Sequence, residues 1–217
     1  MIMDANQVTG GFLDASPALG AFKQERFVRG CSLESVSVRS LDLIVHLGSD
    51  LSLVNGPTSD FLKAEANLMS TSIEYGLPVL GICFGAQMMS LVLGGQVTRM
   101  PEPEIGWTSV YSTTGTGVLG GEWFQWHYDS FSFPQGVERL AENSACPQGF
   151  RMGRSLATQF HPELDESVLD HWLETGGNDE LSAIGISSTE IIDQTRSRIG
   201  DARRRFDDLL EWFLKTV

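Results

Sequence analysis

The sequence of residues 78–93 is PVLGICFGAQMMSLVL, in which two apolar runs flank a turn rich in glycine. Residues 78–82 predict a buried strand, and residues 86–93 predict a helix that ends at the following glycine pair. The turn between them, GICFG at 81–85, is the cysteine form of the G-x-S-x-G nucleophile elbow, in the strand-to-helix context that this motif requires. The stretch therefore predicts an α/β fold with a reactive thiol at the turn.

The residues before this stretch predict a second strand and a connecting helix. Residues 41–47 form a short apolar run, and residues 61–75 carry an apolar stripe at helical spacing. Ser59 or Asp60 can cap this helix, and Gly76 ends it. Strand, helix and strand within about 40 residues make a βαβ unit with parallel strands and a right-handed crossover.

The remaining segments are less regular. Residues 104–112, 122–126 and 155–160 predict short strands that include an antiparallel portion, and residues 201–214 predict a helix that packs on the sheet through one apolar face. Residues 1–40 contain no convincing first strand, because Gly, Ser and Asp interrupt every apolar run. We expect a single domain over 1–217, with 1–40 as a poorly readable N-terminal part and 190–217 as a C-terminal helical part.

The composition argues against several classes of protein. The chain has 217 residues with 15 basic and 28 acidic side chains, and its formal charge of −13 repels the phosphates of nucleic acids. It has no apolar stretch of about 18 residues that would span a bilayer, and its first residues do not resemble a signal peptide. We therefore expect a cytoplasmic protein that binds neither nucleic acid nor membrane.

The three cysteines, at positions 31, 83 and 146, are an odd number without paired spacing. This argues against a disulfide framework and against a zinc knuckle. No other metal-ligating constellation is recognised in the sequence, so we expect no metal and no cofactor.

Cys83 would lie at the N-terminus of the helix that follows the turn. There the positive end of the helix dipole and unpaired N–H groups favour a thiolate, and the N–H of Phe84 can donate to an oxyanion. The alternative is a buried structural cysteine in a glycine-rich turn. Strand, turn and helix agree with one another, which favours the nucleophile.

A thiolate nucleophile needs a base that can also protonate the leaving amine, and histidine suits both tasks. Of the four histidines, His161 has the best context, since it follows an expected strand and precedes Pro162 and Glu163. Glu163 can accept a hydrogen bond from one ring nitrogen and leave the other facing Cys83. His127 is a rival base, whereas a position inside a strand or on a surface helix favours structural roles for His46 and His171, respectively.

The motif GICFGAQ at 81–87, followed downstream by QFHPE at 159–163, resembles the class I (triad-type) glutamine amidotransferase domain. Cys83, His161 and Glu163 match its nucleophile, base and orienting acid. EIGW at 104–107 and WHYD at 126–129 further resemble the free-standing branch that is related to the glutaminase domain of GMP synthase and to γ-glutamyl peptidases. The resemblance extends over residues 41–164.

The resemblance implies an open, mostly parallel sheet flanked by helices in a flavodoxin-like, three-layer arrangement, with the nucleophile elbow at a strand-helix turn. It also implies cleavage of a γ-glutamyl amide through a thioester, and substrate binding by Gln87, His127, Tyr128 and Asp129. An aromatic core corner is the alternative for the WHYD stretch. The family's Gly-Gly-Pro loop is replaced here by Gly48-Ser49-Asp50, so we expect oxyanion donors at Phe84, Gly48 and Ser49.

The sequence leaves the identity of the leaving amine open. A stand-alone hydrolase of γ-glutamyl amines or peptides is favoured, because the branch that the sequence resembles includes γ-glutamyl peptidases. Four aromatic residues expected near the pocket can hold a larger, apolar leaving amine, unless they pack in the core: Trp107, Trp123, Trp126 and Tyr128. The first alternative is a glutaminase subunit that releases ammonia for a separate synthase or ligase partner. An alternative from another class is a catalytically silent module that binds a metabolite.

Overall fold

The computed structural model describes residues 1–217 except 6, 8, 32, 34–35 and 217. Nine strands of the described residues form one open sheet in the order β2-β1-β3-β4-β9-β8-β7-β5-β6. The parallel part consists of β2 (Phe27–Val28), β1 (Ile2–Met3), β3 (Ile44–His46), β4 (Val79–Ile82) and β9 (Ser155–Thr158). The antiparallel part consists of β8 (Pro147–Met152), β7 (Glu138–Glu142), β5 (Val97–Ser112) and β6 (Gly121–Phe131). The predicted α/β class is confirmed.

The helix α1 (Asp60–Tyr75) connects the parallel neighbours β3 and β4, as the βαβ pattern predicts. The Oγ atom of Ser59 accepts a hydrogen bond from the N–H of Leu62, and Gly76 ends the helix in the left-handed conformation at φ 78°. The next helix, α2 (Phe84–Val92), starts directly after Cys83, two residues before the predicted position. The N-terminus of α2 therefore points at the carboxyl end of β4.

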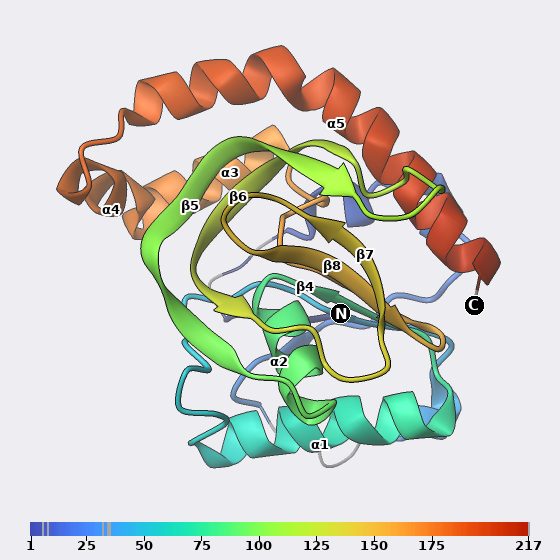
Figure 1. Cartoon of the computed structure of the whole chain (residues 1–217). Helices are drawn as coiled ribbons and strands as arrows, with labels where there is room; N and C mark the ends of the chain where they lie inside the picture. Colours follow the sequence, from blue (N-terminus) through green and yellow to red (C-terminus); the bar gives the residue numbers. More distant parts are fainter. Residues whose placement is uncertain (6, 8, 32, 34–35, 217) are drawn as a thin grey trace.

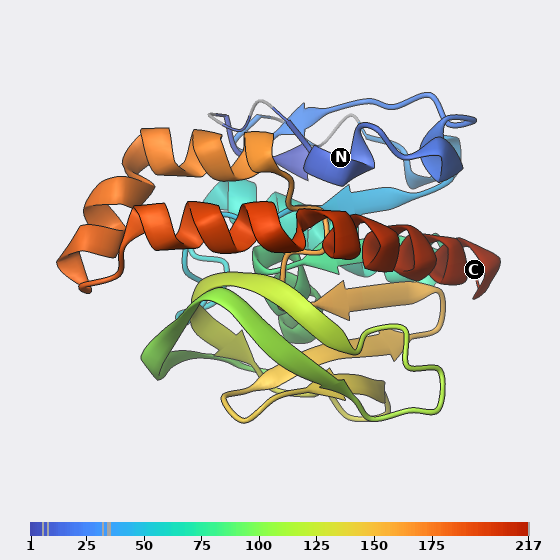
Figure 2. The same ribbon diagram turned by 90° about the horizontal axis from the view of Figure 1, so that it is seen from above.

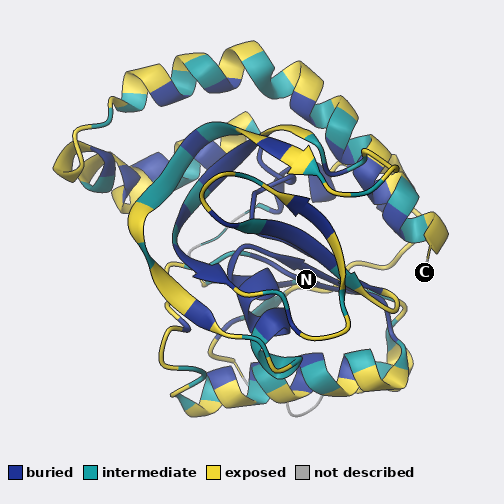
Figure 3. Cartoon of the chain, viewed as in Figure 1, coloured by how far each residue is buried: buried dark blue, intermediate teal, exposed yellow. Residues whose placement is uncertain are grey.

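Helices cover both faces of the sheet (Figures 1 and 2). Alternate residues of β4 belong to two hydrophobic clusters, because successive side chains of a strand point to opposite faces. Leu80 and Ile82 pack with Phe206 and Phe213 of the C-terminal helix α5 (Ser188–Thr216), whereas Val79 packs with α1 and α2. The predicted open sheet flanked by helices is confirmed. Figure 3 shows that α2 is buried, while α5 carries a buried stripe on an otherwise exposed helix.

A helical segment links β9 to α5. It comprises α3 (Glu166–Trp172), a kinked turn at Leu173–Gly177 with Gly176 at φ 126°, and α4 (Asn178–Ala183). Short 3₁₀ helices lie at Gly11–Leu13, Pro17–Leu19 and Val38–Ser40. None of the helices built from the described residues combines the length and apolar character needed to cross a bilayer.

The structure corrects the expectation that residues 1–40 hold no convincing strand. β1 and β2 are present, and β1 lies between β2 and β3 inside the parallel part. Each has only two residues, which is too short to show a periodic pattern. The segment 104–112 is part of the longer strand β5, which pairs with β6 through a register shift between Arg99 and Glu104. The strands β7 and β8 were not predicted.

Candidate active site

Cys83 occupies the sharp turn between β4 and α2, with φ 50° and ψ −105°. Among the described residues it is the only non-glycine residue with a positive φ. Such a conformation is costly and persists only when its surroundings enforce it. The N–H of Cys83 donates to the carbonyl oxygen of Thr158 on β9 at 2.8 Å, and its carbonyl accepts from the N–H of Gln87 at 3.0 Å. The turn is thus fixed to the sheet on one side and to α2 on the other.

Two glycines of the GICFG motif are required by space. A Cβ atom on Gly81 would lie 2.7 Å from the carbonyl oxygen of Gly85. A Cβ atom on Gly85 would collide with the carbonyl oxygen of His46 on β3. Gly81 is therefore crowded by the start of α2 and Gly85 by the neighbouring strand β3, so neither position tolerates a side chain.

His161 and Glu163 lie just beyond the end of β9, the neighbour of β4. Nδ1 of His161 lies 2.8 Å from Oε1 of Glu163, and both side chains are buried. The backbone N–H of His161 donates to the carbonyl of Phe124 at 2.9 Å. The ring of Trp172 packs edge-on against the imidazole at 4.8 Å between ring centres. The imidazole is therefore held by its backbone, by a carboxylate and by an aromatic ring.

The structure brings Cys83 and His161 together beside Gly48. A Cβ atom built on Gly48 would lie 2.8 Å from Cε1 of His161 and 3.7 Å from Cβ of Cys83. Burial lowers the pKa of His161, but the charges of Glu163 and Cys83 and hydrogen bonds to both side chains outweigh this effect and raise it to about 10. This arrangement favours an imidazolium at His161 beside the sulfur of Cys83 at neutral pH.

A cleft of about 640 Å³ opens above this group. Eight residues predicted for the site line it: Gly48, Ser49, Cys83, Gln87, His127, Tyr128, Asp129 and His161. Two other residues predicted for the site lie behind the residues that line the cleft. Glu163 is buried under His161, and the ring of Phe84 is buried although its N–H lies at the first turn of α2.

Gln87, His127 and Asp129 form one hydrogen-bonded unit at the base of the cleft. Nε2 of Gln87 donates to the carbonyl oxygen of Asp129 at 2.9 Å, and Nδ1 of His127 lies 3.1 Å from the same oxygen. The Asp129 carboxylate accepts from Arg99 at 3.0 Å and from the hydroxyl of Ser52 at 2.6 Å. Nε2 of His127 lies 3.2 Å from Oε1 of Gln125, so both ring nitrogens face acceptors inside the protein and His127 is a poor rival to His161 as a base.

Hydrogen bonds join one aromatic wall of the cleft to α4. Nε1 of Trp126 donates to Oε1 of Glu180 at 2.9 Å. Burial raises the pKa of Tyr128, and its hydrogen bond to the same Glu180 acts in the same direction. The guanidinium of Arg99 lies 4.6 Å from the centre of the Tyr128 ring. The helical segment after β9 therefore closes this side of the cleft.

Two of the four aromatic residues expected near the pocket lie elsewhere. Trp123 is buried and stacks on Phe160 at 4.7 Å, and Trp107 donates from Nε1 to Thr195 of α5 at 2.9 Å. Both pack in the core, so their expected place at the pocket is wrong. Trp123 lies nearer the start of β6 than the pocket-lining residues 126–129, and there its ring packs on Phe160.

The cleft also contains residues that were not predicted from the sequence. Arg99, His171, Trp172 and Glu180 all line it. The last three come from the helical segment 166–183, and nothing in the sequence shows that this segment folds back over β6. His171 was expected on a surface helix, and it does lie on α3.

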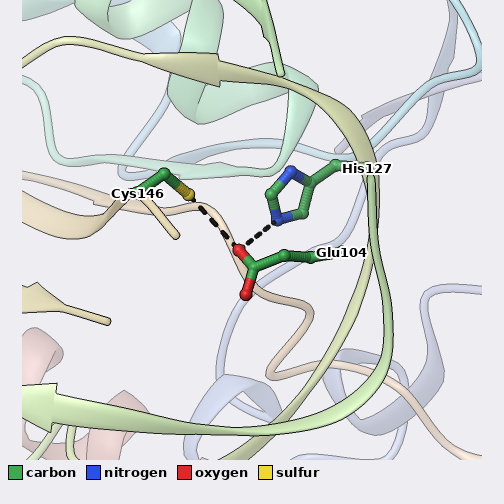
Figure 4. A group of neighbouring side chains, drawn as sticks. All are labelled: Glu104, His127 and Cys146. Atoms are coloured by element: carbon green, nitrogen blue, oxygen red, sulfur yellow. Dashed lines mark hydrogen bonds and ion pairs between the residues drawn. The ribbon is translucent and has the colours of Figure 1, made fainter. Parts of the chain in front are cut away.

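One group of potential metal ligands lies behind His127. Oε2 of Glu104 is 3.3 Å from Nε2 of His127 and 3.3 Å from Sγ of Cys146 (Figure 4). The same oxygen accepts from Gln148 at 2.9 Å, and the other carboxylate oxygen accepts from Asn143 at 2.6 Å. Burial raises the pKa of Cys146 to about 12, with the charge of Glu104 acting in the same direction, which keeps this thiol protonated. Through these contacts, Glu104 and the residues bonded to it hold the His127 ring in place.

A family model and several curated proteins match this chain. The profile of a family described as glutamine amidotransferase class-I matches residues 22–175. The chain is 31% identical over 190 residues to a glutamine-hydrolyzing GMP synthase of Aeropyrum pernix, covering 80% of this chain and 37% of that protein. It is 34% identical over 171 residues to the corresponding protein of Corynebacterium jeikeium, covering 71% and 32%. The chain thus spans about a third of the length of these curated relatives.

Two solved structures are similar over nearly the whole chain. A glutamine amidotransferase from Thermotoga maritima superposes with a TM-score of 0.86 at 25% identity, covering 98% of this chain and 96% of that one. A glutamine amido transferase from Methylobacillus flagellatus superposes with a TM-score of 0.83 at 21% identity, covering 100% and 93%. The second likeness shows the fold alone.

Proposed function

Because the chain belongs to the class-I glutamine amidotransferase family, we propose that it hydrolyses γ-glutamyl amides with Cys83 as the nucleophile. The observation that carries this proposal is the meeting of Cys83 and His161 at the wall of one cleft, with Glu163 at 2.8 Å behind the imidazole. A thiolate, an acid-base group and an orienting carboxylate are the parts that acyl transfer needs.

In the first half of the reaction, the Cys83 thiolate attacks the γ-carbonyl carbon and a C–S bond forms. The carbonyl electron pair moves to oxygen, and the oxyanion accepts hydrogen bonds from the N–H of Phe84 and from the Gly48–Ser49 loop. His161 then gives its proton to the amide nitrogen as the C–N bond breaks. The amine leaves, and a γ-glutamyl thioester remains on Cys83.

In the second half, neutral His161 takes a proton from water while the water oxygen attacks the thioester carbonyl. The second oxyanion uses the same donors. When it collapses, the C–S bond breaks, glutamate leaves and the thiolate and imidazolium are restored. A raised pKa of His161 suits this resting state, since the thiolate needs a charged partner.

The glutamyl part of the substrate is assigned to the unit around Gln87 and Asp129. The Asp129 carboxylate attracts an α-ammonium group, and Arg99, which is bound to Asp129 at 3.0 Å, attracts an α-carboxylate. Gln87, His127 and Tyr128 complete the wall on which the chain of the substrate lies.

The size of the cleft favours a leaving amine larger than ammonia. A volume of about 640 Å³ lies within the range of pockets for drug-sized ligands. Its aromatic wall of Trp126, Tyr128 and Trp172 offers apolar surface to an amine substituent. We therefore place γ-glutamyl amines or peptides ahead of glutamine as substrates.

The second candidate is a glutaminase subunit that supplies ammonia to a separate synthase. The names of the curated relatives favour it, since these proteins are glutamine-hydrolyzing GMP synthases. Measuring kcat/KM on glutamine, on a γ-glutamyl anilide and on a γ-glutamyl dipeptide separates the two. A preference for the anilide or dipeptide supports the first candidate, whereas activity on glutamine that appears only with an added synthase supports the second.

A catalytically silent binding module is tested by covalent labelling at neutral pH with a glutamine-like electrophile such as a diazoketone analogue. The Cys31→Ser protein is the right background, because Cys31 is the exposed thiol and Cys146 is buried. We expect one label on Cys83, protection by substrate, and no label after Cys83→Ser. An unlabelled Cys83 together with no turnover of any γ-glutamyl amide would refute the enzymatic proposal.

A further inference from the structure

Arg29 is a buried cation that lies behind the cleft, directly after β2. Its side chain is 2% exposed. It donates from Nε and Nη2 to the two carboxylate oxygens of Glu65 on α1 at 2.9 and 3.0 Å, and it forms an ion pair with Asp4. These two carboxylates offset the cost of burying the guanidinium.

The same guanidinium holds two successive carbonyl groups of the loop after β3. Nη2 donates to the carbonyl of Leu47 at 3.3 Å, and Nη1 donates to the carbonyl of Gly48 at 3.2 Å. In an extended strand, successive carbonyls point to opposite sides. Here both accept from Arg29, so the chain leaves the extended conformation at Gly48.

The direction of these carbonyls fixes the direction of the N–H groups that follow them. No described peptide bond is cis, and in a trans peptide the N–H points opposite to the C=O of the same unit. The N–H groups of Gly48 and Ser49 therefore both point away from Arg29. Within the described part of the chain, neither donates to a protein acceptor.

The side of this loop that faces away from Arg29 faces the proposed catalytic residues. Gly48 and Ser49 line the cleft together with Cys83, and Gly48 lies against the ring of His161. Two neighbouring N–H groups that point to one side form an anion-binding nest. The nest opens where a tetrahedral oxyanion on Cys83 would need donors.

Arg29 also touches the other half of the oxyanion site. Its guanidinium carbon lies 4.6 Å from the centre of the Phe84 ring, and Phe84 supplies the first N–H of α2. One side chain thus contacts both the loop and the helix start that would hold the oxyanion.

We propose that Arg29 is the positioning residue of the oxyanion site, which fixes the Gly48–Ser49 peptide with its N–H toward Cys83. The inference rests on the proposed function. The loop needs such an anchor because it reads Gly48-Ser49-Asp50 and lacks the proline that the family resemblance leads one to expect at its third position. A proline would fix the backbone there through its ring.

The central test is the Arg29→Lys variant with glutamine or the best γ-glutamyl amide. Lysine keeps the positive charge beside Glu65 and Asp4. Its single nitrogen cannot bond to both carbonyls and to the Glu65 carboxylate at once, as the planar guanidinium does. Loss of one oxyanion donor lowers kcat by about 100- to 1000-fold, so we expect misorientation of the donor to lower it by about 10- to 100-fold. KM should stay close to the wild-type value, because the glutamyl contacts are unchanged.

Alkylation of Cys83 by iodoacetamide distinguishes this role from general damage. That reaction forms no oxyanion, so its rate should be the same in Arg29→Lys and in the wild type. The matched control is Arg205→Lys, because Arg205 also donates to a backbone carbonyl, that of Glu122 at 2.6 Å, and lies 5.3 Å from the Trp123 ring. This control should leave kcat unchanged.

A second variant keeps the proposal testable if the lysine is poorly tolerated. In Arg29→Ala, added guanidinium at low millimolar concentration should restore part of kcat, whereas methylammonium should not, because only guanidinium reproduces the planar fork. An unchanged kcat in both variants overturns the inference. An Arg29→Lys protein in which turnover and alkylation fall by the same factor overturns it as well. Absence of rescue in a folded Arg29→Ala protein also counts against it.

A crystal structure of Arg29→Lys separates this inference from the proposed function. If the wild type turns over no γ-glutamyl amide, the proposed function fails, and the orientation of the Gly48–Ser49 peptide alone decides the inference. A rotated peptide supports it. A peptide that keeps the wild-type orientation overturns it, whatever the enzymatic result.

Discussion

At Cys83, the role proposed for the thiol requires a backbone conformation that is unfavourable for stability. The residue adopts φ 50° and ψ −105°, a region that a residue with a Cβ atom occupies at a cost of about 1–3 kcal/mol. In return, its sulfur stands at the start of α2, beside His161 and open to the cleft. The strained backbone thus helps to hold the thiol at the cleft.

The strain at Cys83 leads to a prediction about stability. Cys83→Gly should be more stable than Cys83→Ala by about 1 kcal/mol, because glycine adopts a positive φ without steric cost. Urea unfolding of the two variants measures the difference. Both should be inactive, so the comparison depends on the backbone alone. An alanine variant as stable as the glycine variant would show that the turn is not strained.

The carboxylate of Glu163 leads to a prediction about protonation. The charge of Glu163 is the largest of the effects that raise the pKa of His161 to about 10, so Glu163→Gln should lower that pKa. NMR titration of the His161 ring measures it directly. The imidazolium should then be lost at a lower pH, and the alkaline limb of kcat should move to lower pH with it. An unchanged titration would exclude Glu163 as the main charge partner.

At the scale of elements, the elbow depends on the contact between α2 and β3. Gly85 sits in the first turn of α2, where a Cβ atom would collide with the carbonyl oxygen of His46. The helix start can approach the strand this closely only because no side chain intervenes. This approach aims the N-terminus of α2 at the cleft.

Replacement of Gly85 by alanine should therefore destabilise the protein by several kcal/mol and abolish turnover, since backbone must move to make room. The control is Gly200→Ala in the interior of α5, where a Cβ atom meets nothing within 4 Å. That change should stabilise the protein by about 0.5–1 kcal/mol through helix propensity. Thermal unfolding of both variants tests the pair, and similar effects at the two sites would contradict the packing argument.

The elements also differ in how far sequence patterns predict them. α1 has an N-cap, an apolar stripe and a terminal glycine, so its bounds follow from local chemistry. β1 pairs with its neighbours through two residues, and its place inside the sheet depends on contacts with segments 25 and 44 positions away. Short strands of this kind gain their stability from the sheet, and no local pattern marks them.

At the scale of the whole molecule, one buried ionic group joins the N-terminal part to the rest of the fold. Arg29 binds Asp4 beside β1 and Glu65 on α1, and Glu65 lies 3.3 Å from Nδ1 of His46 on β3. Burial raises the pKa of Glu65, but hydrogen bonds to His46 and Arg29 and their charges outweigh it and lower this pKa to about 2.

This group should make stability depend on pH in the acid range. Because the folded pKa of Glu65 is below its ordinary value of 4.5, its contribution is fully present above about pH 4.5 and is lost as the pH falls toward 2. The loss is at most about 3 kcal/mol. The difference between the unfolding free energies at pH 6 and pH 3 should therefore be smaller in Glu65→Gln than in the wild type, and an equal difference in the two proteins would contradict this assignment.

Local sequence patterns are sufficient to predict the family, the α/β class and the central βαβ unit with its elbow. These features follow from residues close together in the chain, where helix caps, apolar periodicity and the space needed at a tight turn act locally. The sequence also singles out Cys83, His161 and Glu163 as candidates, because each lies next to a predicted strand end.

Contacts between distant segments decide which groups surround these three residues. The tertiary structure places Trp126, Tyr128 and Trp172 on the cleft and leaves Trp107 and Trp123 in the core. It also brings Arg29 against the carbonyls of Leu47 and Gly48. These contacts join segments distant in sequence, and their geometry depends on sheet register and on how helices fold back over the sheet. A pattern within one segment does not show which distant segment that segment meets.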